Sequence, residues 1–145
     1  MATISQSALL PYSAEQMFAL VNDIAAYPKF MNGCINAEVL AVEADAVTAR
    51  LDLGKAGLRY SLTTRNTLQP PERMTMTLVD GPFSVFSAQW RFVALKADAC
   101  KTSLDMRFEF RAGLIDAALK ALFEATSRDL VNAICKRAEQ LYGKK

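Results

Sequence analysis

Three side chains able to act as acids, bases or ion-pair partners occupy alternate positions at Asp105, Arg107 and Glu109. Two carboxylates beside a guanidinium could supply a general acid and a general base. The residues between them are apolar, however, and alternation in a strand turns the three charges outward. A solvated ladder of cross-strand charge pairs is therefore the favoured interpretation.

Histidine is absent from the 145 residues, which excludes Ser–His and Cys–His catalysis as well as histidine-ligated metals. The three cysteines, Cys34, Cys100 and Cys135, are far apart and form no CxxC motif. They are interpreted as reduced, partly buried thiols rather than disulfides or zinc ligands. We therefore expect a protein that is not an enzyme and that needs no metal and no obligatory cofactor.

Polar side chains with a different chemistry lie on the opposite, inward side of one strand. Tyr60, Thr64 and Asn66 share their parity with Leu58 and Leu62. A buried polar group needs a partner from the protein, from water or from a ligand. The three are thus candidate anchors for the polar head of a ligand, with hydrogen bonding across neighbouring strands as the alternative.

Aromatic and methionine side chains form the inward faces of the following strands and of the last helix. They either pack as an ordinary core or line an adaptable apolar pocket, for which flexible methionines are suited. The candidate lining residues are Met74, Met76, Leu78, Phe86, Trp90, Phe92, Met106, Phe108, Leu119 and Phe123.

The stretch Asp80-Gly81-Pro82-Phe83 satisfies the requirements of a tight turn. It lacks the several glycines of a phosphate-binding loop. We interpret it as a turn at the rim of the cavity, with Tyr27 and Phe30 as further rim residues.

The elements that position these side chains follow from the hydrophobic periodicity. Residues 2–10 suit a first strand, and Ser13 and Gln16 have the spacing of a capping box that starts a helix. A second short helix is predicted over residues 26–31, with Pro28 in its first turn.

A period of two begins at Cys34 and predicts about six strands, and after Arg111 the period becomes helical for about thirty residues. Short connections favour an antiparallel meander, and one long amphipathic helix against a curved sheet gives a two-layer α+β fold. The length suits a single domain spanning residues 1–145.

The net charge of +2 is too small to indicate nucleic acid by itself, and no DNA partner is expected. No apolar run reaches the length of a membrane helix, so no stable membrane insertion is expected. The first residues lack the basic start and apolar block of a signal peptide, which predicts a cytoplasmic protein.

This order of elements resembles the helix-grip layout of the START-like (SRPBCC) superfamily. Several segments are similar to the polyketide cyclase/dehydrase-like branch, which includes ubiquinone-binding respiratory proteins and RatA-type ribosome-association toxins, and they are closest to the RatA type. These segments are LPYSAEQMFALVNDIAAYPKFMNGC (10–34), KAGLRYSLTTRNTL (55–68), LVDGPF (78–83), WRF (90–92), FEF (108–110) and KRAEQLYG (136–143).

The resemblance implies a hydrophobic cavity between the long helix and a curved antiparallel sheet of about seven strands. For the quinone-binding members it implies a bound ubiquinone and support of respiration. Many of those relatives carry tryptophan where this chain has Gly33. For the RatA-type members it implies binding to the large ribosomal subunit, which blocks subunit association and translation.

The favoured function at this stage is a non-catalytic carrier of a hydrophobic small molecule, ubiquinone or another lipid. The alternative is a RatA-type toxin acting on the large ribosomal subunit, and a polyketide cyclase-like enzyme is third. On the alternative, the outward-facing Arg59, Arg65 and Arg91 are candidate contacts to rRNA phosphates.

Overall fold

The computed structural model describes residues 2–55, 57–113 and 117–144. The order of elements agrees with the sequence prediction of strand, two short helices, six strands and one long helix. In chain order the elements are β1 (Ala2–Leu10), α1 (Ala14–Asn22), the 3₁₀ helix η1 (Ile24–Lys29), β2 (Cys34–Val42), β3 (Ala46–Lys55), β4 (Leu58–Gln69), β5 (Arg73–Asp80), β6 (Phe83–Lys96), β7 (Ala99–Phe110) and α2 (Ala117–Tyr142).

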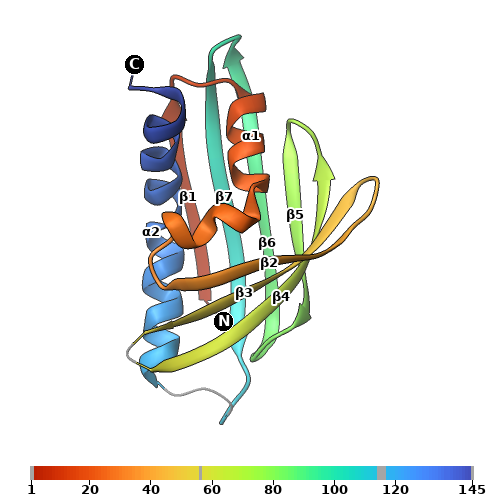
Figure 1. The fold of residues 1–145 in the computed structure, drawn as a ribbon, viewed down its shortest axis with the longest axis vertical. Helices are drawn as coiled ribbons and strands as arrows, with labels where there is room; N and C mark the ends of the chain where they lie inside the picture. The colour runs from red at the N-terminus through yellow and green to blue at the C-terminus, as the bar shows by residue number, and fades with distance from the viewer. Residues whose placement is uncertain (1, 56, 114–116, 145) are drawn as a thin grey trace.

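The strands of the described residues form one seven-stranded antiparallel sheet in the order β1-β7-β6-β5-β4-β3-β2. Strands β2 to β6 each pair with the next strand along the chain, as the predicted meander requires, and β1 pairs with β7. Figure 1 shows β2, β3 and β4 running at a steep angle to β1 and β7, so that the sheet curves around α2. The predicted α+β helix-grip fold is confirmed.

The first helix begins where the capping box places it. The Ser13 hydroxyl accepts a hydrogen bond from the Gln16 backbone N–H at 3.1 Å, and the Gln16 side-chain oxygen accepts one from the Ser13 N–H at 3.0 Å. Two of the N–H groups that a helix start leaves without partners are thereby satisfied.

The second short helix differs from its prediction. It is the 3₁₀ helix η1, which starts at Ile24 rather than near residue 26, and Pro28 is its fifth residue rather than part of its first turn. The reason is that Asp23 ends α1 and at once starts η1, because its carbonyl accepts a hydrogen bond from the Ala26 N–H at 3.2 Å. A 3₁₀ helix this short loses only one hydrogen bond to an internal proline.

The long helix α2 has 26 described residues where about thirty were predicted. The predicted start at Leu114 and Ile115 lies outside the described residues. Its buried face joins a core to which the sheet and α1 contribute.

The strand alternation is confirmed in β6 and β7. Phe86, Ala88, Trp90 and Phe92 are buried in β6. In β7, Asp105, Arg107 and Glu109 are exposed while the residues between them are buried. The outward orientation predicted for these three charges is therefore confirmed.

Candidate functional site

A small cavity lies inside the fold between α2 and the curved sheet. Its volume is about 30 Å³, which is space for a water molecule. Pockets that hold drug-sized ligands are typically about 300–1,000 Å³. The cavity is lined by Tyr27, Met31, Leu51, Leu53, Leu62, Met76, Phe86, Trp90, Met106, Phe123, Ser127 and Leu130.

Five of the predicted ligand-binding residues belong to this lining: Met76, Phe86, Trp90, Met106 and Phe123. The lining leucines of β3 and β4 were not among the predicted ligand-binding residues, although the alternation of Leu51 and Leu53 placed these two on the inner face. Ser127, a buried hydroxyl residue in the apolar stripe of α2, was not among them either.

Phe123 of α2 lines this cavity at the centre of a group of aromatic rings. Its ring lies 4.8 Å from the ring of Phe108 and 5.0 Å from that of Phe83, both edge-on. Tyr60, Phe86 and Phe110 have ring centroids within 6.4 Å of it. Edge-to-face pairs of this kind stabilise one another beyond their buried area, so the aromatic residues form a packed cluster.

The three inward polar residues of β4 differ in how they are satisfied. The Thr64 hydroxyl donates to the Asn66 side-chain oxygen at 2.8 Å, and both residues are buried. Their partners therefore lie along the same strand, which neither alternative in the sequence analysis described. The Tyr60 hydroxyl is buried and has no hydrogen-bond partner among the described residues. Burial also raises the pKa of Tyr60, which keeps the hydroxyl protonated as a donor.

The remaining predicted lining residues lie in the core away from the cavity. Phe92 stacks beside Trp90 and meets Phe18 of α1 edge-on, with 5.7 Å between the Phe92 and Phe18 ring centroids. Met74 and Leu119 are buried, and Leu78 is partly buried. These side chains support the lining rather than form it.

The predicted rim residues divide into two groups. Tyr27 lines the cavity, and its hydroxyl donates to the Val21 carbonyl. Burial raises the pKa of this hydroxyl. Phe30 packs edge-on against Tyr27, and the Arg137 guanidinium of α2 lies 5.5 Å from the Phe30 ring centroid. Both aromatic residues therefore attach η1 to the rest of the fold.

The second group follows β5. Gly81 and Pro82 form the predicted turn, with Asp80 exposed at the end of β5, and the φ of +155° at Gly81 favours glycine. Phe83 is only 1% exposed and belongs to the aromatic cluster of Phe123. It is thus a core residue, whereas Asp80 to Pro82 form a surface turn.

Close packing between α2 and the turn before β2 accompanies the small cavity volume. A Cβ atom on Gly33 would lie 2.8 Å from the Thr126 hydroxyl oxygen and 3.2 Å from a Leu122 methyl carbon. The Thr126 hydroxyl donates to the Asn32 carbonyl at 2.9 Å. The tryptophan that many quinone-binding relatives carry at this position does not fit the present packing.

The outward arginines differ in their partners. Arg65 forms an ion pair with Glu43 at 3.1 Å, and the hydrogen bond and charge of Glu43 raise the pKa of this guanidinium. Arg59 and Arg91 are exposed. Arg91 lies directly opposite Arg73 of β5, a residue that the sequence analysis did not single out.

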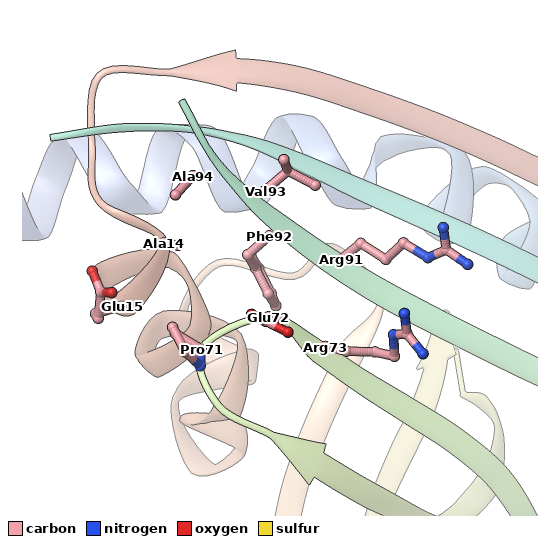
Figure 2. Close-up of a pocket in the computed structure, with 9 residues that line it drawn as sticks. All are labelled: Ala14, Glu15, Pro71, Glu72, Arg73, Arg91, Phe92, Val93 and Ala94. Carbon is pink, nitrogen blue, oxygen red and sulfur yellow. The ribbon is translucent and has the colours of Figure 1, made fainter. Parts of the chain in front are cut away.

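Arg73 and Arg91 border a surface groove of about 540 Å³ beside the start of α1 (Figure 2). The groove is larger and more open to solvent than the interior cavity. The other residues that line it are Ala14, Glu15, Pro71, Glu72, Phe92, Val93 and Ala94.

Comparison with known families places the fold. The model of the family described as "Polyketide cyclase / dehydrase and lipid transport" matches residues 10–135. The chain belongs to this family. Among solved structures, a START superfamily protein from Mycobacterium smegmatis superposes with a TM-score of 0.77 at 24% identity, covering 96% of this chain and 98% of the other. This likeness supports the START-like fold.

Several relatives resemble the chain over nearly its whole length. The ribosome association toxin RatA of Vibrio cholerae is 43% identical and the RatA of Escherichia coli is 40% identical, with 99% and 98% of this chain covered and 99% and 90% of theirs. The coenzyme Q-binding protein COQ10 homolog B of Xenopus laevis is more distant, at 26% identity over 97% of this chain and 59% of its own length. The relatives thus support the ribosome alternative better than the carrier function that the sequence analysis favoured.

Two absences hold for the part of the chain that the structure describes. No three His, Cys, Asp or Glu side chains there gather as a metal site requires. No helix there has both the length and the apolar character needed to cross a membrane.

Proposed function

We propose that this chain is a ribosome-association factor of the RatA type, which binds the large ribosomal subunit and blocks its joining to the small one. The observation that carries this proposal is the identity of 40–43% with proteins named RatA over 98–99% of the chain. The proposed activity is non-catalytic, and its site of action is the cytoplasm.

The interior of the fold supports ribosome binding over the carrying of a quinone. A cavity of about 30 Å³ lined by packed side chains has no room for a quinone ring. The outer side of the sheet offers exposed arginines, and guanidinium groups pair well with RNA phosphates.

Sucrose-gradient profiles of cells that overexpress the chain test the proposal. We expect fewer joined ribosomes, more free subunits, and the protein sedimenting with the large subunit. Unchanged profiles, with the protein remaining at the top of the gradient, would contradict it. A control strain expressing Gly33→Trp tests the packing requirement, because this variant should unfold and leave the profile normal.

A second candidate function is the binding of a hydrophobic molecule with a polar head, such as ubiquinone. It is supported by the Tyr60 hydroxyl, a buried donor without a partner among the described residues, and by the similarity to a coenzyme Q-binding protein. A carbonyl oxygen of a quinone would satisfy this donor, provided that Phe123 moves to enlarge the cavity.

Solvent extraction and mass spectrometry of the purified protein test this second function. A prenyl quinone in stoichiometric amount, lost in Tyr60→Phe, would support it. A reproducibly empty protein that also takes up no added quinone would exclude it.

A further inference from the structure

Two arginines face each other on the outer side of the sheet. Arg73 of β5 and Arg91 of β6 are direct partners in the antiparallel register, and both are exposed. Like charges directly opposite each other in a sheet destabilise it. The free protein therefore carries a repulsive pair that an anion between the two guanidinium groups would relieve.

Neither arginine is neutralised by the protein. The ion pairs of the described residues include none to Arg73 or Arg91, whereas Arg50 and Arg65 of the sheet have partners. Arg50 lies 3.4 Å from a Glu38 oxygen, and Arg65 lies 3.1 Å from a Glu43 oxygen. The Arg73–Arg91 pair thus differs from these two in retaining its full charge.

The guanidinium of Arg91 is held by neighbouring side chains. Its Nε donates to the Gln89 side-chain oxygen at 2.8 Å, and the Gln89 amide donates to the Thr75 hydroxyl at 3.2 Å. These bonds use only the Nε of Arg91, so its two terminal nitrogens remain available. Figure 2 shows the Arg73 and Arg91 side chains extending in the same direction from adjacent strands. This arrangement presents two planar donors to one ligand, and such donors match phosphate oxygens.

The remainder of the groove determines where a polyanion would lie. Glu15 and Glu72 line the part near α1. These carboxylates repel phosphate. An RNA backbone would therefore contact the arginine side of the groove and avoid the α1 side.

We infer that the Arg73–Arg91 pair is a contact site for phosphate groups of ribosomal RNA on the large subunit. This inference rests on the proposed function and adds the surface through which it acts. Of the arginines named from the sequence, Arg91 belongs to this surface, while Arg65 is compensated by Glu43.

A binding experiment tests the inference. The purified, labelled protein is titrated with purified Escherichia coli large ribosomal subunits over a range of KCl concentrations. For Arg73→Ala/Arg91→Ala we expect affinity to fall roughly 10- to 100-fold and the slope of log K against log[KCl] to shrink by about 1 to 2. The matched control is Lys120→Ala/Lys136→Ala, which removes two exposed charges from α2 and should change neither quantity.

A charge-preserving variant guards against loss of fold. Arg73→Lys/Arg91→Lys should keep the salt slope of the wild type and lose only part of the affinity, because lysine binds phosphate without the planar fork of arginine. Thermal unfolding of each variant should show that the alanine pair is at least as stable as the wild type, since the repulsion between the strands is removed.

The outcomes separate the two hypotheses. Wild-type protein that does not bind the large subunit would overturn both the proposed function and this inference. Binding by the wild type, with an unchanged salt slope in the alanine pair, would overturn the inference alone. If the affinity of the alanine pair fell while its salt slope stayed unchanged, the two arginines would contact a ribosomal protein rather than RNA, which would also overturn the inference.

Discussion

The interior cavity and the arginine-bordered groove differ in volume, in the polarity of their lining and in whether their charged groups have partners. The cavity measures about 30 Å³ and is lined mainly by apolar side chains, whereas the groove measures about 540 Å³ and is bordered by two arginines without ion-pair partners among the described residues. In this protein, packed side chains leave little space inside the fold, and charged side chains without ion-pair partners lie on the surface. The difference teaches that the family fold alone does not decide where such a protein binds its partner.

Replacing Phe123 with alanine should produce the largest effect, because it opens the cavity. Its ring is 3% exposed and packs on the aromatic cluster, so the free energy of unfolding should fall by about 3–5 kcal/mol. Urea denaturation measures this loss, with Leu141→Ala on the exposed side of α2 as a nearly neutral control. A loss below about 1 kcal/mol would mean that the cavity collapses easily, and the contrast between the two sites would weaken.

Gly33→Ala should have the next largest effect and tests how tightly α2 closes the interior. Gly33 and Gly57 both have positive φ, at +87° and +84°, but a Cβ atom on Gly57 meets nothing within 4 Å. Both variants should lose about 1–2 kcal/mol from backbone strain. Gly33→Ala should lose about 1–3 kcal/mol more, because Thr126 must move. Equal losses in thermal unfolding would show that the contact with α2 relaxes freely.

Removing the hydroxyl of Tyr27 and that of Tyr60 should change the free energy of unfolding in different directions. Tyr27 donates to the Val21 carbonyl, so Tyr27→Phe should lower the free energy of unfolding by about 1 kcal/mol. The Tyr60 hydroxyl is buried without a described partner, so Tyr60→Phe should leave stability unchanged or raise it by up to about 1 kcal/mol. If purified Tyr60→Phe were instead clearly less stable in urea, a bound molecule or water would be satisfying Tyr60, and the interior would not be closed.

The last expected effect is a pH dependence at Cys34. Burial, with the charge of Asp52 as the second cause, raises the pKa of this thiol from 9.0 to about 11. The unfolded chain then loses the proton near pH 9 and the folded chain only near pH 11, so stability is present below pH 9 and declines between these values. The gap in urea midpoint between the wild type and Cys34→Ser should therefore narrow from pH 8.5 to 10.5. A constant gap would indicate that water reaches the thiol.

Local patterns were sufficient to predict most of the fold. The capping box at Ser13, the two-residue alternation of β6 and β7 and the apolar stripe of α2 depend on neighbours within a few positions. The predicted start of η1 was wrong because Asp23 is both the last cap of α1 and the first cap of η1. The residue types in this segment do not reveal that double role.

The candidate site was predicted less completely. Alternation identified the inner wall, including Phe86 and Trp90, but it could not tell how much space the wall would leave around Phe123. Arg73 was missed although a signal existed. It and Arg91 each stand nine positions from Pro82, so a hairpin centred on that turn places them opposite each other.

By itself the sequence determined the order of elements, the inward and outward faces of each strand and the family, because these follow from short-range periodicity and from quoted motifs. Only the tertiary structure decided that the cavity is small, that Thr64 bonds Asn66, that Glu43 compensates Arg65 and that the Arg73–Arg91 pair has no ion-pair partner among the described residues. The physical reason is that free volume and charge pairing depend on contacts between distant segments. The hydrogen bond from the Thr126 hydroxyl to the Asn32 carbonyl, for example, joins the turn before β2 to the middle of α2.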